Sequence, residues 1–401
     1  MKPRKITQRV TWMGAIDWDR RLFDSLIPLP DGTSYNSYLI EGGGKRVLVD
    51  TVDPPMSEVL LSQLENVPSL DYVIAHHAEQ DHAGSIPHVL EKYPQAKVIA
   101  TPKGKELLME HLLIPAERFR TIEDGERISL GDRTLRFFHT PWVHWPETMV
   151  TYLEEERILF TCDFFGSHLA TTDLYVNDRQ SFERAGRVYE AAKRYYAEIM
   201  MPFRKIIRKN IEKIEKLDIR LIAPSHGPCY DNPDFILDAY RDWISETPGN
   251  EVVVAYISMH GSTRKMVEHL VNSLAARGIR VHQFDLAVAD IGKLAITLVD
   301  AATLVVGTPT IHTGPHPNVV YAAYLANCLR PKLKFATVIG SYGWNTRAVD
   351  QVAGMIPNLN VEVLNPVLIK GCPEEKAFAS LDELAETILK KHREADLAPT
   401  N

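Results

Sequence analysis

The residues that decide the fold of this chain read DYVIA, positions 71–75, followed by HHAEQDHAG, positions 76–84. The first five form an apolar run that predicts a buried strand, so the next nine fall on the loop at the end of that strand. Five of these nine carry side chains that can bind a metal ion. We therefore expect a metal site at one edge of a sheet.

The composition is that of an ordinary globular protein, with 45% hydrophobic and 24% charged residues. A length of 401 residues predicts two domains. The net charge of −7 argues against nucleic acid as the main partner. No apolar run reaches the roughly 18 residues of a membrane span, and no hydrophobic segment follows the basic N-terminus. We expect a cytoplasmic protein with no membrane or nucleic-acid partner.

A turn-rich break at Thr247-Pro248-Gly249-Asn250 divides the pattern of predicted elements. We place one domain at 1–248 and another at 249–401. The first mixes short strands with helices: strands at 36–40, 45–50, 71–75, 97–100, 127–130, 134–138, 149–153, 158–161 and 221–224, and helices at 56–66, 85–93, from 101 onward and at 181–216. The second alternates strands (252–257, 281–285, 301–306, 334–339, 361–364) with helices (263–277, 319–328, 348–355, 381–392). Such alternation predicts a doubly wound parallel sheet.

The metal-binding stretch has the spacing H-x-E-x-D-H, formed by His77, Glu79, Asp81 and His82. Alternate residues of an extended loop face the same side, so we expect the first three to converge and His82 to turn toward a second ion. His76 alternates away from His77 and is expected to be structural. Three further candidates lie at the ends of later strands: His144, Asp163 and His226. Seven nitrogen and oxygen ligands suffice for two ions, with one carboxylate bridging them.

The type of ligand narrows the choice of metal. The set contains no thiolate, and the four cysteines (Cys162, Cys229, Cys328 and Cys372) form no C-x-x-C pair. Three carboxylates are unusually many for zinc, which often takes more histidines or thiolates. A mixed histidine and carboxylate set favours iron or manganese.

A second candidate site lies in the C-terminal half. Ser258-Met259-His260-Gly261-Ser262-Thr263 follows a predicted strand and opens a helix, where hydroxyls and backbone amides can bind a phosphate. Without a lysine this is not a Walker motif, and it suits the single phosphate of FMN. Two more loops follow neighbouring strands: Gly307-Thr308-Pro309-Thr310-Ile311-His312-Thr313-Gly314 and Gly340-Ser341-Tyr342-Gly343-Trp344. Ligands of doubly wound sheets bind at this edge, and Tyr342 and Trp344 can stack on a ring.

Together these motifs resemble a known family. The N-terminal region resembles the metallo-β-lactamase fold, whose usual signature H-x-H-x-D-H carries Glu79 in place of its second histidine here. That residue, followed by His144, Asp163 and His226, resembles the flavodiiron proteins, or A-type flavoproteins. The fragments Thr33-Ser34-Tyr35-Asn36 and His144-Trp145-Pro146 are also similar to that family. The resemblance spans about residues 10 to 390.

The resemblance implies an αββα metallo-β-lactamase-like domain followed by a flavodoxin-like domain. It implies an oxidoreductase that reduces O2 to water or NO to N2O at two iron ions, with electrons delivered through FMN. Asp163 would bridge the irons and act as the catalytic carboxylate. A head-to-tail homodimer, or a dimer of dimers, would bring the flavin of one chain to the irons of the other. The absence of C-x-x-C pairs implies an external donor, either rubredoxin or reduced F420.

Two other functions remain open from the residues alone. The metal domain could be a hydrolase of the thioesterase type with an appended flavodoxin domain, although Glu79 and the flavin loops argue against it. The chain could also be a redox sensor or electron carrier, although a carrier needs no open two-metal site. One departure from the family concerns the pocket: where members often carry His or Tyr, this chain has Phe23 and Asp24. The source of protons and the preference between O2 and NO are therefore open.

Overall fold

The apolar run at 71–75 forms strand β9 (Tyr72–Ile74), in the interior of a seven-stranded sheet. This sheet belongs to a computed structural model that describes residues 1–176 and 182–399. The strands in their spatial order are β1 (Arg4–Lys5), β2 (Val10–Trp12), β7 (Tyr38–Glu41), β8 (Arg46–Val49), β9, β10 (Lys97–Ala100) and β11 (Phe119–Thr121). Because β8, β9 and β10 run parallel, the residue after β9 lies at the carboxyl edge of this sheet.

A second sheet of five strands faces the first. Its spatial order is β12 (Arg127–Ser129), β13 (Thr134–His139), β14 (Met149–Leu153), β15 (Ile158–Cys162) and β16 (Leu221–Pro224). Tyr38 and Val47 of the first sheet pack against Phe137, Leu153 and Phe160 of the second in one hydrophobic core. The pair β15 and β16 is parallel, so both strands deliver their following residues to the same edge.

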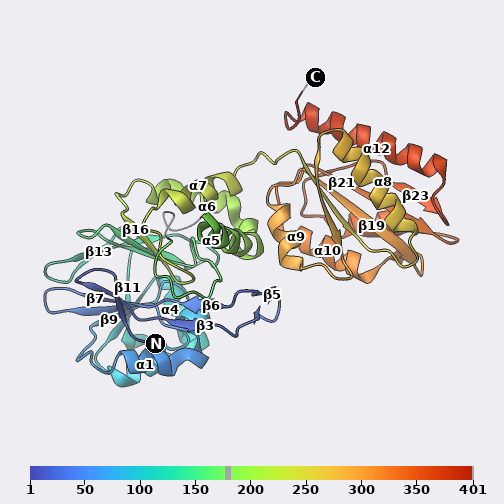
Figure 1. Cartoon of the computed structure of the whole chain (residues 1–401). Helices are drawn as coiled ribbons and strands as arrows, with labels where there is room; N and C mark the ends of the chain where they lie inside the picture. Colours follow the sequence, from blue (N-terminus) through green and yellow to red (C-terminus); the bar gives the residue numbers. More distant parts are fainter. Residues whose placement is uncertain (177–181, 400–401) are drawn as a thin grey trace. The chain divides into compact units, whose positions relative to one another are not determined.

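Helices cover both outer faces of this sandwich (Figure 1). The face of the first sheet carries α1 (Ser57–Gln63), α3 (Ile86–Lys92) and α4 (Pro102–Leu112), whose Leu60, Val89 and Leu108 share a core with β9. Over the second sheet lie α5 (Phe182–Tyr195), α6 (Arg204–Ile214) and α7 (Asp234–Trp243). Two short antiparallel pairs complete this part: β3 (Ala15–Asp17) with β6 (Thr33–Tyr35), and, between them in the chain, the hairpin of β4 (Leu22–Phe23) and β5 (Ile27–Pro28). The layer order is the αββα arrangement expected.

The C-terminal half forms a doubly wound sheet, which confirms the predicted architecture. Its strands are β18 (Arg280–Asp285), β17 (Glu251–Tyr256), β19 (Thr303–Ile311), β21 (Phe335–Tyr342) and β22 (Glu362–Val363) in spatial order, with β23 (Val367–Lys370) also on β21 and β20 (Gly314–Pro315) on β19. Every pairing is parallel except that of β20.

Helices lie on both faces of this sheet as well (Figure 1). One face carries α8 (Ser262–Ala276) and α12 (Glu375–Glu394), and the other carries α9 (Ile291–Leu298), α10 (Pro317–Leu329) and α11 (Ala348–Gly354). Leu270 and Leu384 belong to the first core, and Leu294 and Ala323 to the second.

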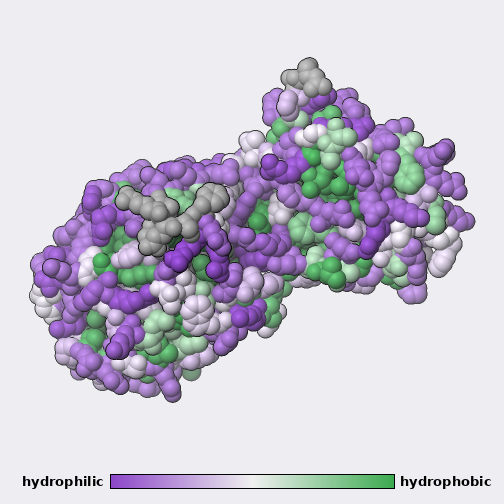
Figure 2. Space-filling view, viewed as in Figure 1, coloured by the Kyte–Doolittle hydropathy of each residue, from purple (hydrophilic) through white to green (hydrophobic). Residues whose placement is uncertain are grey.

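The described chain divides into two compact units. The first comprises Met1–Tyr196 and Phe203–Ile244, and the second Ala197–Pro202 and Ser245–Asn401. The molecular face in Figure 2 is largely hydrophilic, with hydrophobic residues in separate patches. Within residues 1–176 and 182–399, no helix is both long and apolar enough to cross a lipid bilayer.

Some predicted elements differ from those observed. The single helix expected at 181–216 is interrupted between α5 and α6 by a π-helix (Tyr196–Met200) and a 3-10 turn (Met201–Phe203), where Pro202 offers no backbone N–H. Its expected first residue, Ser181, lies outside the described residues. The strand expected at 301–306 continues as β19 to Ile311, and the one expected at 334–339 continues as β21 to Tyr342. The second and third predicted flavin loops, at 307–314 and 340–344, are therefore partly strand.

Candidate metal centre and flavin site

The metal-binding stretch is not extended throughout. Glu79 has an extended backbone (φ −64°, ψ 144°), but the next four residues form the single-turn helix α2 (Gln80–Ala83). The expected convergence of His77, Glu79 and Asp81 by strict alternation is therefore wrong. The helical turn aims Asp81 and His82 away from His77 and toward a different partner.

All seven predicted ligand residues nevertheless come together, and they do so in two groups. Group A consists of His77, Glu79 and His144: the nitrogen Nε2 of His77 lies 2.9 Å from Glu79 Oε2, and that of His144 lies 3.1 Å from the same oxygen.

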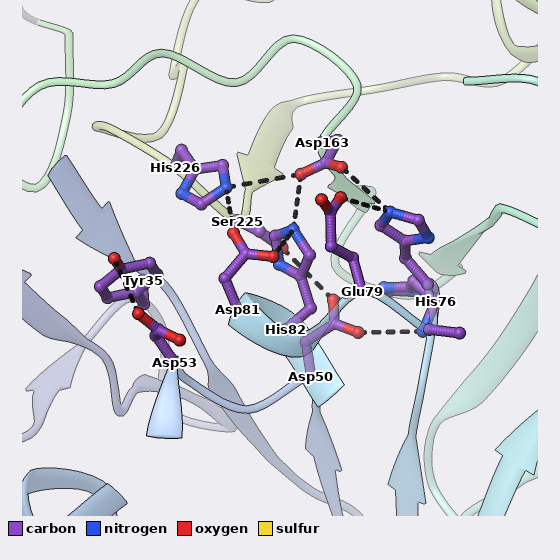
Figure 3. A network of polar contacts seen from close by, with 12 residues as sticks. Tyr35, Asp50, Asp53, His76, Glu79, Asp81, His82, Asp163, Ser225 and His226 are labelled. Carbon is purple, nitrogen blue, oxygen red and sulfur yellow. Dashed lines mark hydrogen bonds and ion pairs between the residues drawn. The ribbon is translucent and has the colours of Figure 1, made fainter. Parts of the chain in front are cut away.

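Group B consists of Asp81, His82 and His226 (Figure 3). The Nε2 atoms of His82 and His226 lie 3.3 and 3.1 Å from the two carboxylate oxygens of Asp81.

Asp163, the residue after β15, lies between the two groups. Its Oδ2 is 3.6 Å from His77 Nε2 and 3.4 Å from His144 Nε2. Its Oδ1 is 2.7 Å from His82 Nε2 and 3.5 Å from His226 Nε2. One carboxylate thus presents one oxygen to each group, which is the geometry of a bridging ligand.

The residues present fit two divalent ions. Both carboxylate oxygens of Asp81 and both of Asp163 are buried, and among the described residues none accepts a hydrogen bond of good geometry. Their near neighbours are the Nε2 atoms of the predicted ligand histidines. Burying carboxylates without well-directed partners is costly, and cations placed between these oxygens and the facing Nε2 atoms would remove that cost. Four histidines and three carboxylates suit iron or manganese.

The thiol of Cys162 lies beside the metal centre, which the sequence did not predict. Cys162 lies with His82 and Asp163 in a possible ligand group. Burial raises the pKa of the Cys162 thiol well above its usual value. Because the thiolate is the form that binds metal, the seven nitrogen and oxygen residues remain the better set.

Protons and metal ions compete for these histidines. Burial alone lowers the pKa of His226, but Asp163 and Asp81 outweigh it and raise that pKa to about 10. The pKa of His144 is raised to about 9 in the same way, by Asp163 and Glu79 against burial. Burial would raise the pKa of Glu79, but its bonds from His144 and His77 hold it below the usual value. Metal binding at this site would therefore be accompanied by release of protons.

Two ligand histidines are fixed by groups behind them. The Nδ1 atom of His77 donates to Oε1 of Glu147 over 2.8 Å, and the backbone N–H of Ala78 donates to the same oxygen over 2.9 Å. The Nδ1 atom of His226 donates to the backbone oxygen of Ser34 over 2.7 Å. Sequence reasoning missed Glu147; its place three residues after His144 was the available signal.

His76 is turned away from both groups. Its Nδ1 lies 2.8 Å from Asp50 Oδ2 and its Nε2 lies 2.7 Å from Thr151 Oγ1. Its backbone N–H also donates to Asp50 Oδ1. Both ring nitrogens are thus occupied in holding the start of the metal-binding stretch.

Asn36 clamps the loop that carries His226. Its amide nitrogen donates to the backbone oxygens of Pro224 and Gly227 over 2.8 and 2.7 Å, and its Oδ1 accepts from Trp12 Nε1 over 2.9 Å. Each end of the loop is therefore tied to one buried amide.

Aromatic side chains pack behind His226. The ring of His168 lies 4.7 Å from that of His226, 4.8 Å from that of Tyr195 and 5.1 Å from that of Phe23. Neither His168 nor Tyr195 was singled out from sequence: His168 is a lone residue between β15 and α5, and Tyr195 is one residue at the end of a long helix. Phe23 is buried here, while Asp24 is exposed on the turn between β4 and β5.

The phosphate loop precedes α8 at the carboxyl edge of the second unit's sheet. Ser258 Oγ accepts from the backbone N–H groups of Gly261 and Arg264. Gly261 has φ +90°, a conformation that favours glycine. Thr263 is 1% exposed, and within the described part of the chain its Oγ1 has no hydrogen-bond partner. A buried hydroxyl at a helix N-terminus fits a phosphate oxygen.

The second flavin loop contacts the residues that directly follow the third loop. Thr310 Oγ1 donates to Thr346 Oγ1 over 2.9 Å, and the N–H of Arg347 donates to the backbone oxygen of Thr313 over 2.6 Å. Trp344 is 80% exposed and Met259 is 52% exposed. Large apolar side chains left in water at a ligand edge fit the ring of a flavin. The other residues predicted for this site also lie on these segments: His260, Ser262, Pro309, Ile311, His312, Gly314, Ser341, Tyr342 and Gly343.

Comparisons with known proteins agree with this architecture. Residues 33–227 match the family model described as "ODP family beta lactamase", and residues 254–381 match the flavodoxin model. The chain is 37% identical over 350 residues to the nitric oxide reductase of Moorella thermoacetica, covering 86% of each chain. It is 31% identical over 397 residues to the coenzyme F420H(2) oxidase of Methanothermobacter marburgensis, covering 95% of each.

A solved structure is similar over the whole length. The rubredoxin oxygen:oxidoreductase from Desulfovibrio gigas superposes with a TM-score of 0.93 at 29% identity, with 99% of this chain and 100% of that one covered. The metallo-β-lactamase-like unit with a mixed histidine and carboxylate centre, joined to a flavodoxin unit, defines a flavin-dependent metalloprotein. The chain belongs to the flavodiiron proteins, also called type A flavoproteins.

Proposed function

We propose that this protein reduces O2 to water, NO to N2O, or both, at two iron ions, with electrons passing through FMN. The observation that carries the proposal is Asp163, which turns one oxygen to group A and the other to group B. A hydrolase or carrier does not require this carboxylate-rich pair of groups followed by a flavin unit in one chain. The relatives named for NO reduction and F420H2 oxidation support the same activity.

The roles of the seven ligand residues follow from their positions. His77, Glu79 and His144 would hold one iron, Asp81, His82 and His226 the other, and Asp163 both. When bound, two irons would supply electrons and polarise a small gas. Because Asp81 and Asp163 are buried, these carboxylates would present fixed charges to the irons in a site with little water.

The flavin residues act by holding FMN at the sheet edge. The hydroxyls of Ser258 and Thr263 and the N–H groups at the start of α8 would bind the phosphate. Trp344 and Met259, both largely exposed, would cover the ring. Reduced FMN and two ferrous ions together hold four electrons, which is the number that takes O2 to water.

We extend the proposal to the assembly. The metal domain at 1–248 and the flavin domain at 249–401 would work in a cytoplasmic head-to-tail homodimer, or a dimer of such dimers. An external donor, rubredoxin or reduced F420, would supply the electrons. The donor of the second relative, F420H2 by its name, supports one of these choices.

Metal and flavin analysis of the purified protein tests the proposal. We expect about two irons and one FMN per chain, and rapid oxidation of the reduced protein by O2 or NO under stopped flow. Zinc with thioester hydrolysis and no flavin would instead identify the hydrolase. A flavin that reoxidises slowly with either gas, at full iron content, would identify an electron carrier.

A further inference from the structure

Groups A and B contain the same types of predicted metal ligand. Group A offers two histidines and one carboxylate of its own, and so does group B; Asp163 is shared. By ligand type alone, the two irons of the proposed function would therefore be equivalent.

The two groups differ in the hydrogen-bond acceptor that lies behind one histidine of each group. Behind His77 of group A stands Glu147, a carboxylate that is 3% exposed and accepts from Nδ1 over 2.8 Å. Behind His226 of group B stands the neutral backbone oxygen of Ser34, accepting over 2.7 Å. The bond lengths match, so the difference between the two contacts is a buried negative charge.

Other carboxylates near the centre do not bond to a ligand histidine. Asp50 is bonded to His76, which turns away from both groups. Asp53 lies 3.4 Å from the guanidinium of Arg20 and accepts from Tyr35. Asp24 is exposed to water. The charge of the buried Asp50 also acts on His82 of group B, but no hydrogen bond joins the two. Among these groups, Glu147 alone places a carboxylate in a direct hydrogen bond with a predicted ligand histidine.

We propose that Glu147 makes the two irons inequivalent by strengthening His77 as a donor, so that the group A iron is bound more tightly and has the lower reduction potential. A carboxylate behind a metal-bound imidazole fixes the ring and raises its basicity. An added negative charge in a buried site stabilises Fe3+ more than Fe2+, because Fe3+ carries the larger charge. The group B iron is then reduced first and the group A iron last.

Glu147→Gln tests this inference in the iron-loaded holoenzyme. The amide can still accept from His77 Nδ1 but carries no charge. We expect one of the two irons to be lost to a chelator about 10–100-fold more readily. Anomalous diffraction at the iron edge should show that group A is emptied. In a redox titration followed by electron paramagnetic resonance, the reduction potential of one iron should rise. The rise should be about 59 mV for each tenfold change in the affinity of the site for Fe3+ relative to Fe2+.

Three controls separate charge from structure. Glu147→Asp keeps the charge and should restore the wild-type order of the two potentials. Glu106→Gln removes a carboxylate from the exposed side of α4 and should leave both irons unchanged. Wild-type crystals soaked in chelator should lose the group B iron first, which tests the inference even if Glu147→Gln does not fold.

The inference is overturned if Glu147→Gln shifts both irons equally, shifts neither, or if wild-type crystals lose the group A iron first. It rests on the proposed function only in requiring two bound irons. A wild-type chain that binds fewer than two metal ions overturns the proposed function itself, so the two failures are distinguishable.

Discussion

At the scale of single residues, Asp163 joins the two groups, and its removal is the sharpest test of the centre. Asp163→Ala deletes the oxygens facing both groups, so we expect loss of both metal ions and of gas reduction, with FMN retained. Metal analysis and the flavin absorption spectrum of one preparation measure both. Asp53→Asn, a change at a nearby carboxylate outside the ligand set, should keep its metals. Full iron content in Asp163→Ala would show that Asp163 is not a bridging ligand.

A second residue, in the C-terminal unit, makes the stability of the fold depend on pH. His392 is fully buried; Nδ1 donates to Asn250 Oδ1 and Nε2 accepts from Thr303 Oγ1, each over 2.7 Å. Burial lowers the pKa of His392 to about 4 from a usual 6.5. The folded state thus binds a proton at His392 less readily than the unfolded state does. The contribution of neutral His392 to the stability of the fold is therefore complete above pH 6.5 and is lost as the pH falls toward 4.

Urea unfolding between pH 7 and pH 4.5 measures this effect. His392→Gln cannot titrate, so its free energy of unfolding should fall less over this range than that of the wild type. Replacing the exposed His88 by Gln should leave the wild-type slope. Equal slopes in the wild type and His392→Gln would show that another group sets the acid sensitivity.

At this scale the sequence identified the ligand-type side chains but not their supports. His77, Glu79 and His226 could be found because metal chemistry restricts residue type and spacing. His168 could not be found this way, and Glu147 offered only its closeness to His144 in the sequence, because a residue that supports a ligand from behind follows no fixed spacing rule. Their roles depend on which strands meet, and that is decided by the packing of the whole unit.

At the scale of elements, apolar periodicity located β7 to β10 and β12 to β16 within a few residues. Apolar periodicity did not locate elements whose residues show no regular alternation of apolar and polar side chains. The helical turn α2 carries three polar residues among its four, and it could not be told from a loop. The strands β19 and β21 extend past their apolar runs because neighbouring parallel strands continue to pair with them. Part of each predicted loop therefore belongs to a strand.

The phosphate loop yields a prediction with two effects. Thr263→Val keeps the shape of this side chain but deletes a buried hydroxyl for which the described residues supply no hydrogen-bond partner. The FMN-free protein should be as stable as the wild type or more stable, because an unpaired buried hydroxyl is costly. FMN binding should weaken by about 1–3 kcal/mol, since a phosphate oxygen loses its donor.

Thermal unfolding of the FMN-free protein and flavin titration measure the two effects. Thr297→Val on α9, whose hydroxyl bonds to Lys293 O, is a matched change away from the loop and should leave FMN affinity unchanged. Unaltered FMN binding in Thr263→Val would mean that this hydroxyl does not face the phosphate.

At the scale of the whole molecule, the proposed head-to-tail dimer predicts complementation between two inactive chains. Asp163→Ala should lack metals but keep FMN, while a chain with weakened flavin binding, such as one with Thr263→Asp, should keep metals. Co-expressed chains that pair at random should recover about a quarter of wild-type gas reduction if electrons cross between subunits. Purified heterodimers carrying two different tags make the measurement direct. No recovery in such heterodimers would indicate transfer within one chain.

The buried amide of Asn36 also bears on the chemical lifetime of the protein. Its NH2 group faces two carbonyl oxygens, those of Pro224 and Gly227. Spontaneous deamidation would turn that donor into a negatively charged oxygen opposite two acceptors, and the loop carrying His226 would be pushed away from the centre. An ageing protein could therefore lose a metal through a one-atom change at a residue that never touches the metal, while every ligand remained chemically intact.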